Sequence, residues 1–440
     1  MKIEQTIQTR REFLRRSIFF LATSCSAPFF LTRTVLALDS ARANAGTASL
    51  PGMSDDRILI VVQMGGGNDG LNTVVPYAMD EYYRVRNTIG ISKDKVLKLN
   101  DTIALHPNLA KLKGLYDDGR MAIVQAVGYP NPDRSHFRSM EIWHTADPQS
   151  KTVAYGWLGR YLDNACPGCD PLANRINPMG AIGLNGYQPV ALKSQRGLGI
   201  AIDNNPDSFR WTPLAEEARD AKESAATFEK LNHVVAASLD NPEIARLDFL
   251  SRVAMNAELS SDRIREIMKK HKPAATKTYP NTNLGRQLQT VSELISGGLD
   301  TRVYYVSMGG FDTHANEVGP HDKLMTELSE GIDAFYADLD RQGNADRVLT
   351  MTFSEFGRRV AQNASDGTDH GTAAPMFLFG SCIKPGIYGT HPDLEPDKLD
   401  HGDLRFATDF RSVYATVLEN WLGAKSAPIL GQEFDKLKFV

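Results

Sequence analysis

The sequence has few cysteines and no excess of positive charge, and both absences exclude classes of protein. Its 440 residues contain four cysteines, 49 Lys and Arg, and 53 Asp and Glu, for a formal net charge of −4. Because no basic excess or stripe is present, we expect no nucleic-acid binding. One Cys-x-x-Cys pair occurs, at Cys166 and Cys169, without a second pair to complete a thiolate metal site. We expect these two thiols to form a local disulfide or to stay unpaired.

The sequence also lacks a clean run of about 20 apolar residues, the length of a membrane-spanning helix. Its apolar N-terminal stretch, "SIFFLATSCSAPFFL", is short and interrupted by polar residues. "TRREFLRRS" precedes it with a twin-arginine pattern, and "ANA" at 43–45 fits a cleavage site, with "LALDSA" as a competing site. We therefore predict a twin-arginine export signal over 1–45 and a periplasmic or secreted mature protein without a membrane span. An amphipathic helix, or a lipoprotein modified at Cys25, is the alternative.

Predicted strands and helices alternate at both ends of the remaining chain. Apolar runs ending in glycine or polar loops indicate buried strands, as in "RILIVVQMGGG" and "RVLTMTFSEFG". This alternation predicts an α/β fold, with a parallel or mixed sheet and helices on both faces. The middle of the chain is polar and rich in helical patterns. We therefore divide the fold into a first core part at 55–150, an insertion or cap region at 151–295, and a second core part at 296–440.

Acidic, histidine and serine residues gather beside glycines in four loops that follow predicted strands. In open α/β sheets, binding sites form at the carboxyl ends of the strands, so these loops are expected to converge. The loops are "GGGNDGLN" (65–72), "NPDRSHF" (131–137), "GGFDTHANE" (309–317) and "FSEFGRR…GTDHG" (353–371).

Five side chains in these loops have the chemistry of metal ligands: Asp69, Asp312, His314, Glu355 and His370. Mixed oxygen and nitrogen ligands suit one or two divalent ions such as Zn or Mn. Each residue also has a purely structural interpretation, such as an Asx-turn at Asp69 or a surface ion pair at Glu355. His136 and His144 are interpreted as packing or surface histidines rather than ligands.

Ser135 stands at a predicted helix start, where it is either an N-cap or a nucleophile. A helix N-terminus and a nearby metal would both ease its deprotonation and its attack as an alkoxide. Arg134, Arg138 and Arg358 lie in the same loops and can hold an anionic substrate through paired N–H groups.

Taken together, the loops resemble a known family. "GGNDGLNTVVP", "VGYPNPDRSHFRSMEIWHTA", "GGFDTH" and "TFSEFGR…GTDHGTA" are similar to the exported bacterial family called domain of unknown function 1501. That family is grouped with the alkaline phosphatase-like superfamily, alongside sulfatases and cofactor-independent phosphoglycerate mutase. The resemblance implies an alkaline phosphatase-like doubly wound sheet, with a mid-chain insertion and a site for two metals.

The superfamily pattern carries over to this sequence with two departures. Its first aspartate matches Asp69, with Asn68 as a rival, its nucleophile matches Ser135, and its last histidine matches His370. The Asp-His spacing at Asp312 and His314 is shorter by two, and Phe356 stands where the pattern has histidine. The resemblance thus implies one metal held by Asp312, His314 and His370. A second, all-oxygen set of Asp69, Glu355 and Ser135 would favour Mg, Ca or Mn.

These observations lead to two hypotheses. The first is a periplasmic metal-dependent hydrolase of phosphate or sulfate esters, acting on a small-molecule or polymer substrate through Ser135. The second is a non-catalytic exported binding or assembly protein with a protein partner, which the missing histidine at Phe356 favours. A redox protein is disfavoured because no flavin, molybdenum or cluster motif occurs. The sequence leaves open whether the protein is an enzyme.

Overall fold

The computed structural model describes residues 56–149, 155–164, 179–184, 186–195, 199–202, 260, 262–270 and 279–440. The expected export signal, the Cys166 and Cys169 pair, and most of the region 151–295 lie outside these residues. All helices and strands named below lie in one compact unit that comprises Ser49–Cys169, Ile176–Phe209 and Arg263–Val440. No helix in the described ranges is both long enough and apolar enough to cross a membrane.

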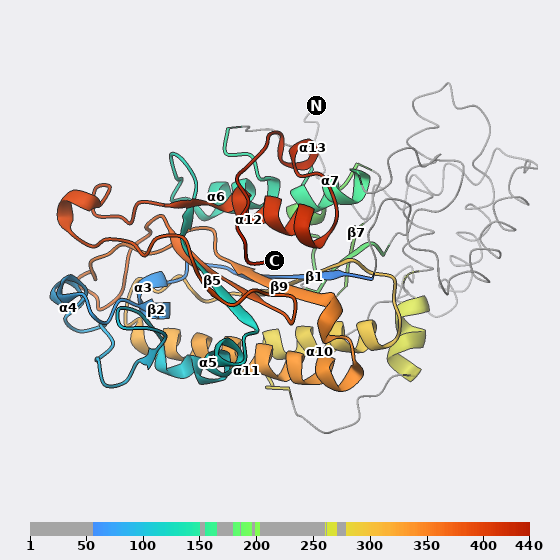
Figure 1. The fold of residues 1–440 in the computed structure, drawn as a ribbon, viewed down its shortest axis with the longest axis horizontal. Coiled ribbons are helices and arrows are strands. Elements are labelled where there is room, and N and C mark those ends of the chain that lie inside the picture. The colour runs from blue at the N-terminus through green and yellow to red at the C-terminus, as the bar shows by residue number, and fades with distance from the viewer. Residues whose placement is uncertain are drawn as a thin grey trace, which may run out of the picture. The chain divides into compact units, whose positions relative to one another are not determined.

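A large mixed β-sheet forms the centre of this unit (Figure 1). Its strands follow the order β11-β5-β10-β9-β1-β8-β6-β7, and β12 pairs with β5. Among these strands β10 alone runs against its neighbours, β9 and β5. The strands span Ile58–Met64 (β1), Met121–Gly128 (β5), Ala181–Gly183 (β6), Gly199–Ala201 (β7), Val303–Met308 (β8), Val348–Phe353 (β9), Ala374–Phe379 (β10), Gly386–Tyr388 (β11) and Thr408–Asp409 (β12).

Side-chain alternation along the central strand β1 divides the core into two layers. Leu59 and Val61 belong to one apolar cluster, whereas Ile58, Ile60 and Val62 belong to the other. Successive side chains of a strand point to opposite faces, so an unbroken apolar run must be covered on both sides. The run "ILIVVQM" meets this requirement, since every residue of β1 is buried.

Helices cover both faces of the sheet, as the sequence predicts (Figure 1). One layer contains α5 (Ala110–Asp117), α10 (Asn283–Ser296) and α11 (Val318–Gln342), and the other contains α6 (His136–Thr145), α7 (Trp157–Asn164), α12 (Phe410–Thr416) and α13 (Ala427–Leu430). A π-helix at Val417–Trp421 continues α12. The expected α/β class, with a central sheet between helices, is confirmed.

Smaller elements flank this core. A second sheet joins β2 (Val74–Val75), β4 (Ala104–Leu105) and β3 (Leu97–Lys98), and short helices occur at α3 (Gly70–Thr73) and α4 (Asp80–Val85). Short 3-10 helices lie at Pro107–Leu109, Val190–Leu192, Ala345–Arg347 and Pro396–Lys398.

The region 151–295, expected to be an insertion or cap, contributes to the core where it is described. Strand β6 pairs in parallel with β8, and β7 extends the sheet beyond it. Helix α10 lies against α11, and its Leu284, Leu288 and Val291 are fully buried. The described parts of this region therefore belong to the same sheet and helix layer as the rest of the fold.

Candidate metal centre

The four loops singled out from the sequence meet at one edge of the central sheet. They leave the carboxyl ends of β1, β5, β8 and β9, and the segment that enters the reversed strand β10 reaches the same edge. The reversal of β10 matters because it places His370, four residues before the strand, among residues that follow parallel strands. This sheet edge is where binding sites form in open α/β folds.

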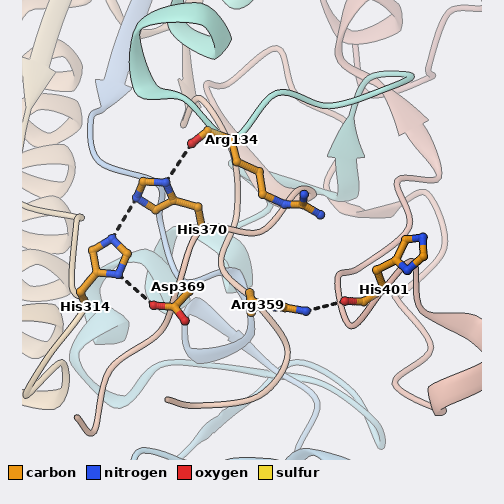
Figure 2. A pocket seen from close by; sticks show the side chains of 6 residues that line it. All are labelled: Arg134, His314, Arg359, Asp369, His370 and His401. Atoms are coloured by element: carbon orange, nitrogen blue, oxygen red, sulfur yellow. Dashed lines mark hydrogen bonds and ion pairs between the residues drawn. The ribbon is translucent and has the colours of Figure 1, made fainter. Parts of the chain in front are cut away.

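Three histidines surround the carboxylate of Asp312. His314 Nε2 and His370 Nε2 each lie 3.0 Å from Asp312 Oδ1, and His136 Nε2 lies 3.5 Å from Oδ2. The Nε2 atoms of His314 and His370 are 3.0 Å apart and face each other (Figure 2). Among the described residues, His136, Asp312 and His370 offer ligand atoms within 4.8 Å of one another.

An acceptor fixes the other nitrogen of each imidazole ring. His136 Nδ1 lies 2.9 Å from Glu355 Oε1, and His314 Nδ1 lies 3.0 Å from Asp369 Oδ1. His370 Nδ1 lies 2.8 Å from the Arg134 carbonyl oxygen (Figure 2). A carbonyl or a carboxylate only accepts, so each Nδ1 carries the proton. In the neutral ring, Nε2 then has a lone pair directed at Asp312.

These side chains fit a divalent cation. Without a cation or an added proton, the three Nε2 lone pairs and the Asp312 oxygens would repel one another. Histidine ligands that donate their second N–H to a carboxylate or a carbonyl are typical of metal sites. Imidazole ligands combined with a carboxylate suit Zn or Mn better than Mg or Ca, which prefer oxygen. His136, Asp312 and His370 would therefore hold one ion, and His314 Nε2 lies beside them, 3.0 Å from Asp312 Oδ1.

Glu355 lies behind the histidines. Its buried carboxylate accepts a hydrogen bond from the Gly66 amide at 2.8 Å and contacts His136. Its carbonyl oxygen accepts from Ser139 Oγ at 2.5 Å and from Trp143 Nε1 at 2.8 Å. Because both donors lie on α6, the same residue fixes the helix that carries His136. Glu355 is thus connected to the histidine cluster by its hydrogen bond with His136.

Arg358 fixes the carboxylate side of the cluster. Its buried guanidinium donates to the carbonyl oxygens of Gly67 at 2.7 Å, Thr368 at 2.9 Å and Phe311 at 2.8 Å, to that of Gly66, and to Asp312 Oδ1 at 2.7 Å. Burial would raise the pKa of Asp312, but the adjacent Arg358 guanidinium outweighs it and holds the pKa well below its usual range. The guanidinium is committed to these acceptors and positions Asp312 instead of facing the cavity.

Phe356 takes the position where the superfamily pattern has histidine. Its ring is buried and lies 5.0 Å from the His136 ring and 4.6 Å from the His370 ring, centre to centre. Gly67, in the loop after β1, has a φ of +82°, and a Cβ there would lie 2.4 Å from the Phe356 ring. The phenyl ring therefore packs against the imidazoles of His136 and His370, and only glycine at position 67 leaves room for it.

Asp69 lies apart from the histidines. Its carboxylate forms a two-pronged ion pair with the buried Arg86, at 2.5 and 2.9 Å. Burial alone would raise the pKa of Asp69, but the Arg86 charge holds it well below its usual range. Beside it, burial and the Asp69 charge raise the pKa of Glu317 to about 9. The structure therefore places Asp69 in a buried ion pair rather than in the second ligand set implied by the resemblance.

Ser135 and Arg134 lie at the rim of the cluster. Ser135 is exposed and is the N-cap residue of α6, but its side chain makes no capping hydrogen bond. Arg134 contacts Asp403 through its guanidinium and His370 through its carbonyl. Both residues therefore lie next to the histidines in sequence and structure, while Arg138 pairs with Glu141 on α6.

Sequence reasoning missed three residues of this arrangement. The sequence favours a packing or surface role for His136, although this residue directly follows Ser135 and precedes a helical pattern. Asp369 adjoins His370 and supports His314, and Arg86 lies in no singled-out loop. The sequence contained a signal for the first two, their places within the quoted loops, but none for Arg86.

An open cavity of about 380 Å³ adjoins the cluster. Figure 2 shows its lining, which consists of Arg134, His314, Arg359, Asp369, His370 and His401. The histidines thus have one side that a ligand can reach from solvent.

We expect Arg86→Met to lower the free energy of unfolding by about 3–5 kcal/mol, because it leaves the Asp69 carboxylate buried without its partner. The double variant Asp69→Asn/Arg86→Met removes that charge and should recover part of the loss. Urea unfolding midpoints measure both effects. A double variant no more stable than Arg86→Met would contradict the ion-pair account.

Comparisons with known proteins show which family the chain belongs to, but they do not indicate its activity. Residues 56–420 match the family described as "Protein of unknown function (DUF1501)", and a comparison with curated proteins finds no match. Similar solved structures include the PsFucS1 sulfatase from Pseudoalteromonas sp., with 10% identity over 93% of this chain and 75% of that chain and a TM-score of 0.38. A protein in the alkaline phosphatase superfamily from Vibrio parahaemolyticus shares 8% identity over 90% of this chain and 77% of that chain, with a TM-score of 0.38.

A mutant of TAB5 alkaline phosphatase with Mg bound shares 9% identity over 76% of this chain and 94% of that chain, with a TM-score of 0.32. All three structural likenesses are too distant to indicate an activity. The family match, in contrast, covers most of the chain and includes every loop that contributes to the histidine cluster. The chain therefore belongs to the DUF1501 family.

Proposed function

We propose that this protein is a metal-dependent hydrolase of phosphate or sulfate esters that acts in the periplasm or outside the cell. The observation that carries the proposal is the convergence of three imidazole Nε2 atoms on the Asp312 carboxylate beside an open cavity. A divalent ion held there would supply Lewis-acid polarisation of an ester oxygen. Arginine at the rim suits an anionic substrate.

Ser135 is the proposed nucleophile. Its hydroxyl is exposed, it is not used as a helix cap, and it lies at the N-terminus of the ten-residue helix α6. The Oγ atom would attack the phosphorus or sulfur atom of the ester, lose its proton to solvent, and expel the alcohol. Water would then hydrolyse the serine ester to release phosphate or sulfate and restore Ser135.

The rest of the site prepares this reaction. Glu355, Asp369 and the Arg134 carbonyl fix the tautomer and orientation of the three histidines. Arg358 holds Asp312 in place, so the ligand atoms are organised before anything binds. Such preorganisation lowers the free energy that is needed to order these groups when an ion binds and when charge develops in the reaction.

A non-catalytic binding or assembly role is the second candidate. It is favoured by the placement of Asp69, which pairs with Arg86 and leaves the expected second ligand set unassembled. Phe356 in place of a histidine points the same way. Under this role, a stable exported partner would copurify with the protein, and Ser135→Ala would leave the phenotype unchanged.

The purified protein is expected to hold about one Zn or Mn ion per chain, measured by elemental analysis. Glu355→Gln should weaken metal affinity about 10–100-fold because it disturbs the hydrogen bond that orients His136. Affinity should also fall on acidification, since protons compete for the imidazoles. The Glu355 hydrogen bond raises the pKa of His136, so this loss should begin above pH 6.5.

Asp80→Asn is the control for this measurement, because Asp80 is an exposed acid on α4 that pairs with Lys93 and does not line the cavity. It should leave the affinity unchanged. A wild-type protein that binds no Zn or Mn at pH 8, or a Glu355→Gln variant with wild-type affinity, would contradict the assignment.

Ser135→Ala should reduce ester hydrolysis by about 10³-fold or more, as the loss of an essential nucleophile does. The metal content should stay the same, because Ser135 is not among the residues whose ligand atoms gather at Asp312. The measurement is turnover of a panel of aryl phosphates and aryl sulfates. Full activity in Ser135→Ala would remove the serine from the mechanism, and an inactive but metal-loaded wild type would favour the binding role.

A further inference from the structure

Two arginines beside the histidine cluster are not used to hold the proposed ion. Arg134 and Arg359 line the cavity together with His314, His370 and His401 (Figure 2). Their side chains are 48% and 44% exposed, so both guanidinium groups are accessible from solvent. This pair lies on the side of the cavity away from His314 (Figure 2).

A buried carboxylate holds the two guanidinium groups next to each other. Asp403 is completely buried, its Oδ2 contacts Arg134 Nη2, and its Oδ1 lies 3.5 Å from Arg359 Nε. The two oxygens of one carboxylate each face one arginine, so both guanidinium groups lie beside Asp403. Arg359 Nη2 also donates to the His401 carbonyl oxygen.

The backbone turn at 401–403 lies close to the guanidinium group of Arg359. Gly402 has a φ of +88°, and a Cβ there would lie 2.6 Å from Arg359 Nη2. His401, the residue before it, also has a positive φ, of 52°. The turn at 401–403 thus approaches the guanidinium closely and supplies both the carbonyl and the carboxylate that fix it.

Acids offset the charge of the two guanidinium groups but do not use all of their N–H donors. Asp403 faces both guanidinium groups. Asp369, the one acid among the lining residues, interacts with the Arg359 charge, and its Oδ1 lies 3.0 Å from His314 Nδ1 and 3.2 Å from Asn363 Nδ2. The guanidinium groups keep N–H donors that contact neither Asp403 nor the His401 carbonyl. Neighbouring guanidinium groups with spare donors are suited to an oxyanion, which they bind with paired charge-assisted hydrogen bonds.

We infer that Arg134 and Arg359 form a binding site for a second oxyanion group of the substrate. The inference rests on the proposed function and deepens it. The substrate is an ester that carries, beside the group that is cleaved at the histidines, a carboxylate, sulfate or phosphate that binds the arginine pair. Esters with a single anionic group would leave this side of the cavity unfilled.

Binding of inorganic sulfate to the metal-loaded protein tests the site without turnover. In calorimetric titrations, Arg359→Gln should weaken sulfate binding about tenfold, the typical loss of one charge-assisted hydrogen bond. Arg359→Lys keeps the charge but loses the paired donors. Its sulfate affinity should lie between those of the wild type and Arg359→Gln. Arg405→Gln is the matched control, because Arg405 is an exposed arginine two residues beyond Asp403 that does not line the cavity.

Equal sulfate affinity in Arg359→Gln, Arg405→Gln and the wild type would overturn the inference, as would the absence of sulfate binding in the wild type. Unchanged unfolding midpoints would show that the variants are folded. These outcomes are independent of hydrolysis, so they stand whether or not the proposed activity is found.

A pair of aryl phosphates extends the test to the substrate. 4-Nitrophenyl phosphate has one anionic group, and 5-carboxy-2-nitrophenyl phosphate adds a carboxylate. Arg359→Gln should raise the KM of the carboxylated ester about tenfold more than that of the plain ester, with similar kcat values, because uniform binding is lost. Equal changes in the two KM values would overturn the assignment to a second substrate group while leaving hydrolysis itself intact.

Discussion

The candidate site depends on the guanidinium of Arg358. It is buried at the edge of the central sheet and bonds to the loop after β1, the loop after β8 and the segment before β10. These loops are far apart in the sequence and have no regular structure of their own, so hydrogen bonds must fix their mutual positions. By donating to Asp312 as well, the same group places the carboxylate around which the histidines gather.

Each of the three histidines is oriented by a supporting group behind it. Each ring is held by a different kind of neighbour: a buried glutamate for His136, an exposed aspartate for His314 and a backbone carbonyl for His370. The common result is that Nδ1 keeps the proton and Nε2 faces inward. The fold therefore brings three imidazole side chains from three loops close together. This arrangement raises the free energy of the folded state unless a cation lies between them.

Two positions separate this site from the pattern of the superfamily that its loops resemble. Phe356 replaces a ligand with an aromatic wall against His136 and His370, and Arg86 neutralises Asp69 within the protein. The first change removes an imidazole and the second engages a carboxylate, so both reduce the groups that could hold a second ion. The arginine pair held by Asp403 then provides guanidinium donors on the other side of the same cavity.

The sequence by itself determined the α/β class, the four loops and several of the cluster residues: Asp312, His314 and His370. Apolar runs that end in glycine and acidic or histidine residues carry that information locally. Only the tertiary structure decided the role of each side chain. Whether Glu355 touches an ion or supports His136, and whether Asp69 binds a metal or Arg86, depends on partners 17 to 219 residues away. A local pattern records which groups a loop contains, but not which distant group neutralises them, because that depends on how the strands are ordered in the sheet.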